Sequence, residues 1–171
     1  LLKEIPLENF VWIDLNDVPE DAETELEQFL KIYIQEEEEM EEIEISSRYM
    51  ETEDTLVANS RFLLDNFEEE PISFIVKNHI LVSVRSQELR SFNETVKKMF
   101  ANPRNYPNGF YILVALLETR VEYDADMIEE LAKEITQLSN RLKTDDDVSD
   151  DILIAIKELQ EKTMLIRENI I

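Results

Sequence analysis

The sequence predicts an α/β (α+β) fold, in which a mixed β-sheet is sandwiched between helices and a long acidic antiparallel helical hairpin follows. In residues 1–121, short runs of branched and aromatic residues alternate with helical stripes. In residues 122–171, apolar residues recur at the steps of three and four that are typical of amphipathic helices. We therefore expect two parts: a mixed α/β sandwich over 1–121 and the hairpin over 122–171. With 43% hydrophobic residues, a chain of 171 residues can bury a substantial core.

The α/β part opens with a strand and a helix. Residues 10–15 (FVWIDL) form an aromatic and branched run that is typical of a strand. A helix is expected over 19–34, with Asp17 as its cap, Pro19 in its first turn and Glu20 completing a capping box. Its apolar stripe consists of Ala22, Leu26, Phe29, Leu30 and Tyr33.

A dense acidic stretch comes next. Met40 and Ile43 lie three residues apart, which predicts a second helix over 36–46. Its glutamates repel one another at i,i+4, which costs a few tenths of a kcal/mol per pair. Such a helix is expected to pack well or to attract counterions.

The central strands are predicted from apolar runs and turn residues. Residues 55–64 read as a strand, and residues 68–71 (EEEP) as a turn. Strands over 72–76 and 80–84 flank Lys77, Asn78 and His79, and Asn78 supplies turn chemistry for a hairpin.

Helices dominate the remainder. One runs from Leu89 to Phe100 and stops before Pro103, and a second over 110–117 is expected to be buried nearly all round. A separate long helix begins near Tyr123, with its stripe at Ile128, Leu131, Ile135, Leu138 and Leu142. A polar loop over 144–149 leads to the last helix, which Ser149 is expected to cap.

Charge and composition exclude several kinds of function. A net charge of −23 repels nucleic acid and anionic membranes, and it attracts divalent cations or a basic protein surface. The chain has no cysteine, and its one glycine, Gly109, rules out a glycine-rich phosphate loop. The single histidine, His79, has no evident catalytic partner. We expect no enzyme activity.

Two features suggest that the sequence is a piece of a longer protein. It begins at Leu1 rather than at methionine, and it ends within an apolar pattern at Ile171. No apolar run reaches about 18 residues, so no membrane span is expected within it.

Read in order, five stretches resemble the N-terminal cytoplasmic domain of CorA-type magnesium/cobalt transport proteins. They are WIDL at 12–15, an acidic helix ending in IEISSRY at 43–49, LVSVR at 81–85, LVALLETRV at 113–121 and ADMIEELAKEI at 125–135. The family's Gly-Met-Asn motif and its membrane helices are absent from this stretch. Transport by the stretch alone is therefore not expected.

The resemblance implies a regulatory role. It implies a homopentamer at the cytoplasmic face of the inner membrane, attached to the membrane only through a C-terminal region outside this sequence. It also implies that weakly bound Mg²⁺, with Co²⁺ as a further candidate, lies between subunits and favours the closed state. The family's metal-binding acid corresponds by position to Asp65, with Glu68 and Glu69 as alternates.

Two other functions remain open from the sequence. The first is an acidic protein-interaction module with no metal role, and the second is the same domain of a zinc-transporting relative. An enzyme that uses a carboxylate pair is the least favoured reading, because no nucleophile or cofactor motif supports it.

Overall fold

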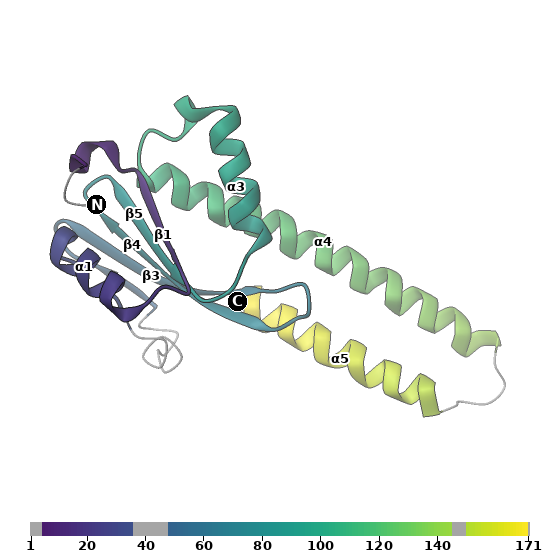
Figure 1. Cartoon of the computed structure of the whole chain (residues 1–171). Helices are drawn as coiled ribbons and strands as arrows, with labels where there is room; N and C mark the ends of the chain where they lie inside the picture. The colour runs from purple at the N-terminus through teal and green to yellow at the C-terminus, as the bar shows by residue number, and fades with distance from the viewer. Residues whose placement is uncertain (1–4, 36–47, 145–149, 171) are drawn as a thin grey trace. The chain divides into compact units, whose positions relative to one another are not determined.

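The computed structural model of the chain describes residues 5–35, 48–144 and 150–170 (Figure 1). The predicted acidic helix over 36–46 and the predicted cap Ser149 lie outside these residues. The elements are a 3₁₀ turn Leu7–Asn9, β1 Trp12–Asn16, α1 Glu20–Leu30, β2 Tyr49–Glu51, β3 Thr55–Leu63, β4 Glu69–Lys77, β5 Ile80–Arg85, α3 Arg90–Ala101, a 3₁₀ turn Pro103–Asn105, α4 Gly109–Thr144 and α5 Asp150–Ile170.

The chain divides into two compact units. A sheet unit comprises Leu1–Phe62 and Glu69–Thr119, and a helical unit comprises Leu63–Glu68 and Arg120–Ile171. The helical unit thus includes the turn between β3 and β4, the part of α4 from Arg120 onward, and α5. The expected division into domains between residues 121 and 122 stays a prediction.

The sheet is mixed, as the sequence predicts. Its strands lie in the order β1-β5-β4-β3-β2. β1 runs parallel to β5, whereas β4 is antiparallel to β5 and β2 is antiparallel to β3. Because β1 and β5 are parallel, the chain must cross from one end of the sheet to the other between them. The crossing is made by α1 and the segments that follow it.

The hairpin between β4 and β5 is confirmed. Lys77 pairs with Ile80, so Asn78 and His79 form a two-residue turn. Asn78 has a φ of 55°, a left-handed conformation that asparagine adopts more readily than most residues.

Helices cover both faces of the sheet (Figure 1). Strand side chains alternate between the two faces, so each face presents side chains for a helix to pack against. On one face, Leu26 and Leu30 of α1 pack with Ile75, Val82 and Val84. On the other face, α3 places the ring of Phe92 within 6.3 Å of Phe74 and 5.7 Å of Trp12, measured between ring centroids. The predicted α/β sandwich with helices on both sides is therefore confirmed.

The predicted capping and extent of α1 are wrong. Pro19, not Asp17, is the N-cap, and no side chain caps the helix. Asp17 has a φ of 48°, so its backbone turns before the helix begins. The helix ends at Leu30 because Lys31 adopts a left-handed conformation. Tyr33, expected on the buried stripe, is 61% exposed.

The predicted turn over residues 68–71 is also wrong. These residues overlap the start of β4, and the turn lies earlier, where the Phe67 amide donates to the Leu64 carbonyl over 2.9 Å. A strand with consecutive glutamates is tolerated because each of the two has a partner. Glu69 pairs with Arg61, and Glu70 accepts hydrogen bonds from the backbone after β5.

The two helices expected over 110–117 and from Tyr123 are one continuous helix, α4. Its first part is not buried all round. Ile112 and Leu116 are fully buried, whereas Tyr111 is 57% and Val114 is 53% exposed. Within the sheet unit, only one side of the helix packs on the core, which the sequence does not reveal because apolar residues occupy both sides.

Gly109 marks a close approach of backbones at the start of α4. Its amide donates to the His79 carbonyl, and a Cβ built on it would lie 2.3 Å from the amide nitrogen of Leu81. We expect Gly109→Ala to lower the free energy of unfolding by at least about 2 kcal/mol, because backbone must move to make room. Urea denaturation measures this effect.

Ser139→Ala is the matched control, because Ser139 is exposed on the same helix. It should change the free energy of unfolding by no more than about 0.5 kcal/mol. Equal effects of the two substitutions would contradict the close approach at Gly109.

The helical unit contains the antiparallel pair that the sequence predicts. Arg141 of α4 pairs with Asp151 of α5, and Glu134 pairs with Lys162 further along. Partners later in α5 thus meet residues earlier in α4, as an antiparallel arrangement requires. The buried residues of this pair are Leu131, Leu138, Ile152 and Ile166.

Candidate functional site

The turn between β3 and β4 brings together two of the three predicted metal ligands. Asp65 and Glu68 are both exposed there. The Asn66 amide group donates to a Glu68 carboxylate oxygen over 2.8 Å, and the Glu68 backbone amide donates to the Asn66 side-chain oxygen over 3.0 Å. The turn therefore presents two carboxylates on a backbone that its own hydrogen bonds order.

Glu69 lies apart from these two residues. It is the first residue of β4, in the sheet unit, and its carboxylate lies 2.9 Å from the Arg61 guanidinium. A cation would have to compete with Arg61 for this carboxylate. Among the predicted ligands, Asp65 and Glu68 are therefore the better placed pair.

Apolar contacts attach the turn to the two long helices. Leu63 packs with Leu131 of α4 and Ile166 of α5, and Phe67 packs against the same cluster. The Lys162 ammonium of α5 lies 5.1 Å from the centroid of the Phe67 ring. The turn is consequently part of the helical unit, although it connects two strands of the sheet.

Asp124, another carboxylate of the helical unit, is already paired. Asp124 lies 3.2 Å from the Arg120 guanidinium, which also donates to the Asn169 carbonyl over 2.8 Å. Burial raises the pKa of Asp124, and Arg120 opposes this shift. Asp124 thus serves the packing of the helices and is a poor candidate for binding a free cation.

In residues 5–35, 48–144 and 150–170, no group of three or more Asp, Glu or His side chains is arranged to hold a metal ion. Magnesium needs few protein ligands because it keeps several waters, so two carboxylates in a turn can contribute to a site without completing one.

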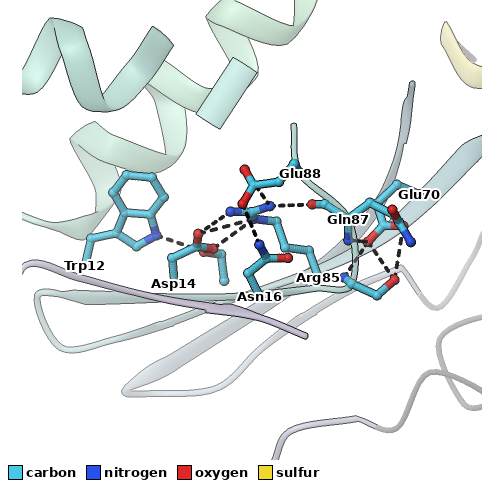
Figure 2. A network of polar contacts seen from close by, with 9 residues as sticks. Trp12, Asp14, Asn16, Glu70, Arg85, Gln87 and Glu88 are labelled. Atoms are coloured by element: carbon cyan, nitrogen blue, oxygen red, sulfur yellow. Dashed lines mark hydrogen bonds and ion pairs between the residues drawn. The ribbon is translucent and has the colours of Figure 1, made fainter. Parts of the chain in front are cut away.

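A buried polar network lies on the α3 face of the sheet (Figure 2). The side chain of Arg85 is 5% exposed, and its guanidinium lies 2.7 Å from an Asp14 carboxylate oxygen. The Ser83 hydroxyl donates to Asp14 over 2.7 Å and accepts from the Trp12 indole over 2.8 Å. These contacts join β1 to β5 across their parallel pairing.

The same network fixes the connection from β5 to α3. Arg85 donates to the Gln87 carbonyl, and the buried Glu70 carboxylate accepts from the backbone amides of Ser86 and Gln87 (Figure 2). Most of these polar groups satisfy one another, and Asn16 Oδ1 is the buried atom of the network without a partner among the described residues, so we assign the network to folding rather than to ligand binding.

The sequence analysis missed this network. The sequence signal for this network is two polar residues, two positions apart, in each of two otherwise apolar strands. They are Asp14 and Asn16 in β1, and Ser83 and Arg85 in β5. Residues two positions apart lie on the same face of a strand. Only the β1–β5 register, in which Asp14 is opposite Ser83, places the polar residues of the two strands together.

Solved structures identify the class of fold. The complete CorA magnesium transporter from Methanocaldococcus jannaschii superposes with a TM-score of 0.75 at 15% identity, over 97% of this chain and 54% of that one. The cytoplasmic domain of ZntB from Vibrio parahaemolyticus superposes with a TM-score of 0.63 at 14% identity, over 91% of this chain and 62% of that one. The fold is thus that of the soluble domain of the Methanocaldococcus jannaschii CorA and of the ZntB cytoplasmic domain.

Sequence comparison then shows the family. The family described as CorA-like Mg2+ transporter protein matches residues 8–171, and the chain belongs to it. The magnesium transport protein CorA of Wolinella succinogenes is 36% identical over 171 aligned residues, which cover 95% of this chain and 53% of that protein. The chain therefore spans about half the length of this curated relative.

The relatives are named as transport proteins rather than as enzymes. Among the helices that the structure describes, none is long and apolar enough to cross a bilayer.

Proposed function

We propose that this chain is the regulatory, cation-sensing cytoplasmic domain of a magnesium transporter. Membership of the CorA-like family over residues 8–171 is the observation that carries the proposal. In this proposal, Asp65 and Glu68 bind Mg²⁺ weakly at the boundary between subunits of a homopentamer. The bound ion favours the closed state, and its loss lets the subunits separate.

The charge of the chain supports this role. With a net charge of −23, copies of the chain repel one another unless cations lie between them. An ion that bridges two acidic surfaces stabilises the state in which both surfaces are close, and by linkage that state binds the ion more tightly. A pair of carboxylates on an exposed turn is suited to such a shared site, because the neighbouring subunit completes it.

The residue types favour a hard cation. The chain has no cysteine and one histidine, so oxygen is the ligand atom that it offers in quantity. Oxygen ligands suit Mg²⁺, and Co²⁺ is a further candidate. The likeness to the ZntB domain supports zinc as a second candidate cargo. An acidic interaction module without a metal role is the alternative that the charge alone supports.

Thermal unfolding of the 171-residue chain tests the proposal when Mg²⁺ is compared with Na⁺ at equal ionic strength. At about ten times its Kd, an ion at one specific site stabilises the folded state by about 1.4 kcal/mol. For a chain of this size, that raises Tm by about 3–5 °C. We expect this rise with Mg²⁺, and we expect it to shrink in Asp65→Ala.

Asp126→Ala is the matched control, because it removes the same charge from an exposed position on α4. The control should keep the full rise with Mg²⁺. A rise that survives Asp65→Ala would remove Asp65 as a ligand. Identical melting in Mg²⁺ and Na⁺ would contradict a complete cation site within this chain and favour either a site that needs residues outside it or the acidic interaction module.

A further inference from the structure

We infer that Phe67 couples the cation-binding turn to helix α5, so that an ion held by Asp65 and Glu68 also stabilises the helical hairpin. This inference rests on the proposed function and adds the route by which the ion acts. It assigns Phe67 and Lys162 as positioning residues that do not themselves bind the ion.

The backbone at Phe67 is the first observation. Phe67 has a φ of 65°, in the left-handed region that bulky side chains rarely adopt. Such a conformation persists when its surroundings hold it in place. Here the Phe67 amide donates to the Leu64 carbonyl over 2.9 Å, and the ring packs against the cluster of Leu63, Leu131 and Ile166.

Lys162 is the second observation, because one side chain joins three segments. Its ammonium lies 5.1 Å from the centroid of the Phe67 ring in the turn. It also lies 3.0 Å from the Glu134 carboxylate of α4, while its own backbone belongs to α5. A movement of α5 therefore changes the contacts of the turn and of α4 together.

Phe67 stands directly beside Glu68 and two residues after Asp65, so the ring and the carboxylates share one short backbone. An ion that binds the carboxylates of Asp65 and Glu68 restricts this backbone to the conformation in which the Phe67 ring packs on the hairpin. Reciprocally, a hairpin that holds the ring favours the turn conformation that binds the ion. Loss of the ion then loosens α5 as well as the turn.

Hydrogen exchange of the 171-residue chain, with and without Mg²⁺ at equal ionic strength, tests this coupling. At about ten times the Kd, any amide whose opening requires release of the ion exchanges about 11-fold more slowly. We expect this slowing in the turn and in the α5 amides between Leu159 and Ile166. In Phe67→Ala, we expect the turn to keep part of the slowing, because reciprocal coupling weakens ion binding, and α5 to lose it.

Amides of β5 serve as an internal reference for exchange by global unfolding, and the comparison uses the α5 amides that exchange faster than they do. Lys162→Met is a second variant that keeps the apolar stem and removes the ammonium, and it should reduce the slowing in α5. Phe100→Ala is the matched control, since Phe100 is 84% exposed in the sheet unit. It should behave like the unchanged chain.

The outcomes separate the two claims. Slowing in the turn without slowing in α5 of the unchanged chain would overturn the coupling and leave the proposed ion site standing. Slowing in α5 that persists in both Phe67→Ala and Lys162→Met would also overturn it. Absence of slowing in the turn itself would contradict the proposed site, and the coupling with it.

Discussion

Asp14→Ala is expected to lower the free energy of unfolding by about 3–5 kcal/mol, because it removes the closest carboxylate partner of the buried Arg85 guanidinium. Among the described residues, it leaves only the Glu88 carboxylate, at 3.9 Å. Three hydrogen bonds of 2.7–3.2 Å join these two side chains, and the Arg85 side chain is 5% exposed. The substitution also removes the acceptor of the Ser83 hydroxyl. Urea denaturation followed by circular dichroism measures the loss.

The pair of Asp54 and Lys77 provides the control. Its atoms lie 3.2 Å apart, but the Asp54 side chain is 57% exposed, so Asp54→Ala should cost much less than Asp14→Ala. Adding Arg85→Met to Asp14→Ala should restore part of the loss, because the uncompensated charge is then gone. A cost for Asp14→Ala as small as that for Asp54→Ala would contradict the role of the network.

Phe92→Ala is expected to cost about 3–5 kcal/mol, because it opens a cavity among aromatic rings that cannot all move to fill it. Phe92 is 1% exposed and lies within 6.3 Å of the ring centroids of Phe74, Phe62 and Trp12. Its ring also lies 4.7 Å from the guanidinium carbon of Arg85. The substitution therefore weakens the apolar core and the polar network together.

Phe100→Ala, on the same helix α3, is the control for that measurement. Phe100 is 84% exposed, and its replacement should change the free energy of unfolding by about 0.5 kcal/mol or less. A small effect at Phe92, comparable to that at Phe100, would contradict the packing of α3 on this face of the sheet.

Elements with strong local signals were predictable from the sequence. Asn78 between two apolar runs predicted the β4–β5 hairpin, and Pro103 predicted the end of α3. Local signals failed where distant partners decide the outcome. By sequence alone, Glu69 and Glu70 resemble turn residues. Their place in a strand follows from their contacts with Arg61 and with the backbone after β5. The sides of α4 that are buried depend likewise on what packs against them.

The candidate site shows the same limit. The family resemblance suggested Asp65 by position, with Glu68 and Glu69 as alternates. The structure distinguishes Glu69 from the other two, because Glu69 begins β4 and its carboxylate pairs with Arg61. The attachment of the turn to α4 and α5 through Phe67 has no local signal, since Lys162 lies far along the chain.

Paramagnetic relaxation by Mn²⁺, a stand-in for Mg²⁺ in oxygen-ligand sites, tests the account most directly. Trace Mn²⁺ added to the isotope-labelled 171-residue chain broadens the amide signals nearest the bound ion. The account predicts the strongest broadening at residues 65–68 and its reversal by excess Mg²⁺ but not by Na⁺ at equal ionic strength. Broadening that is strongest elsewhere, or that Na⁺ reverses equally well, would contradict a specific cation site at this turn.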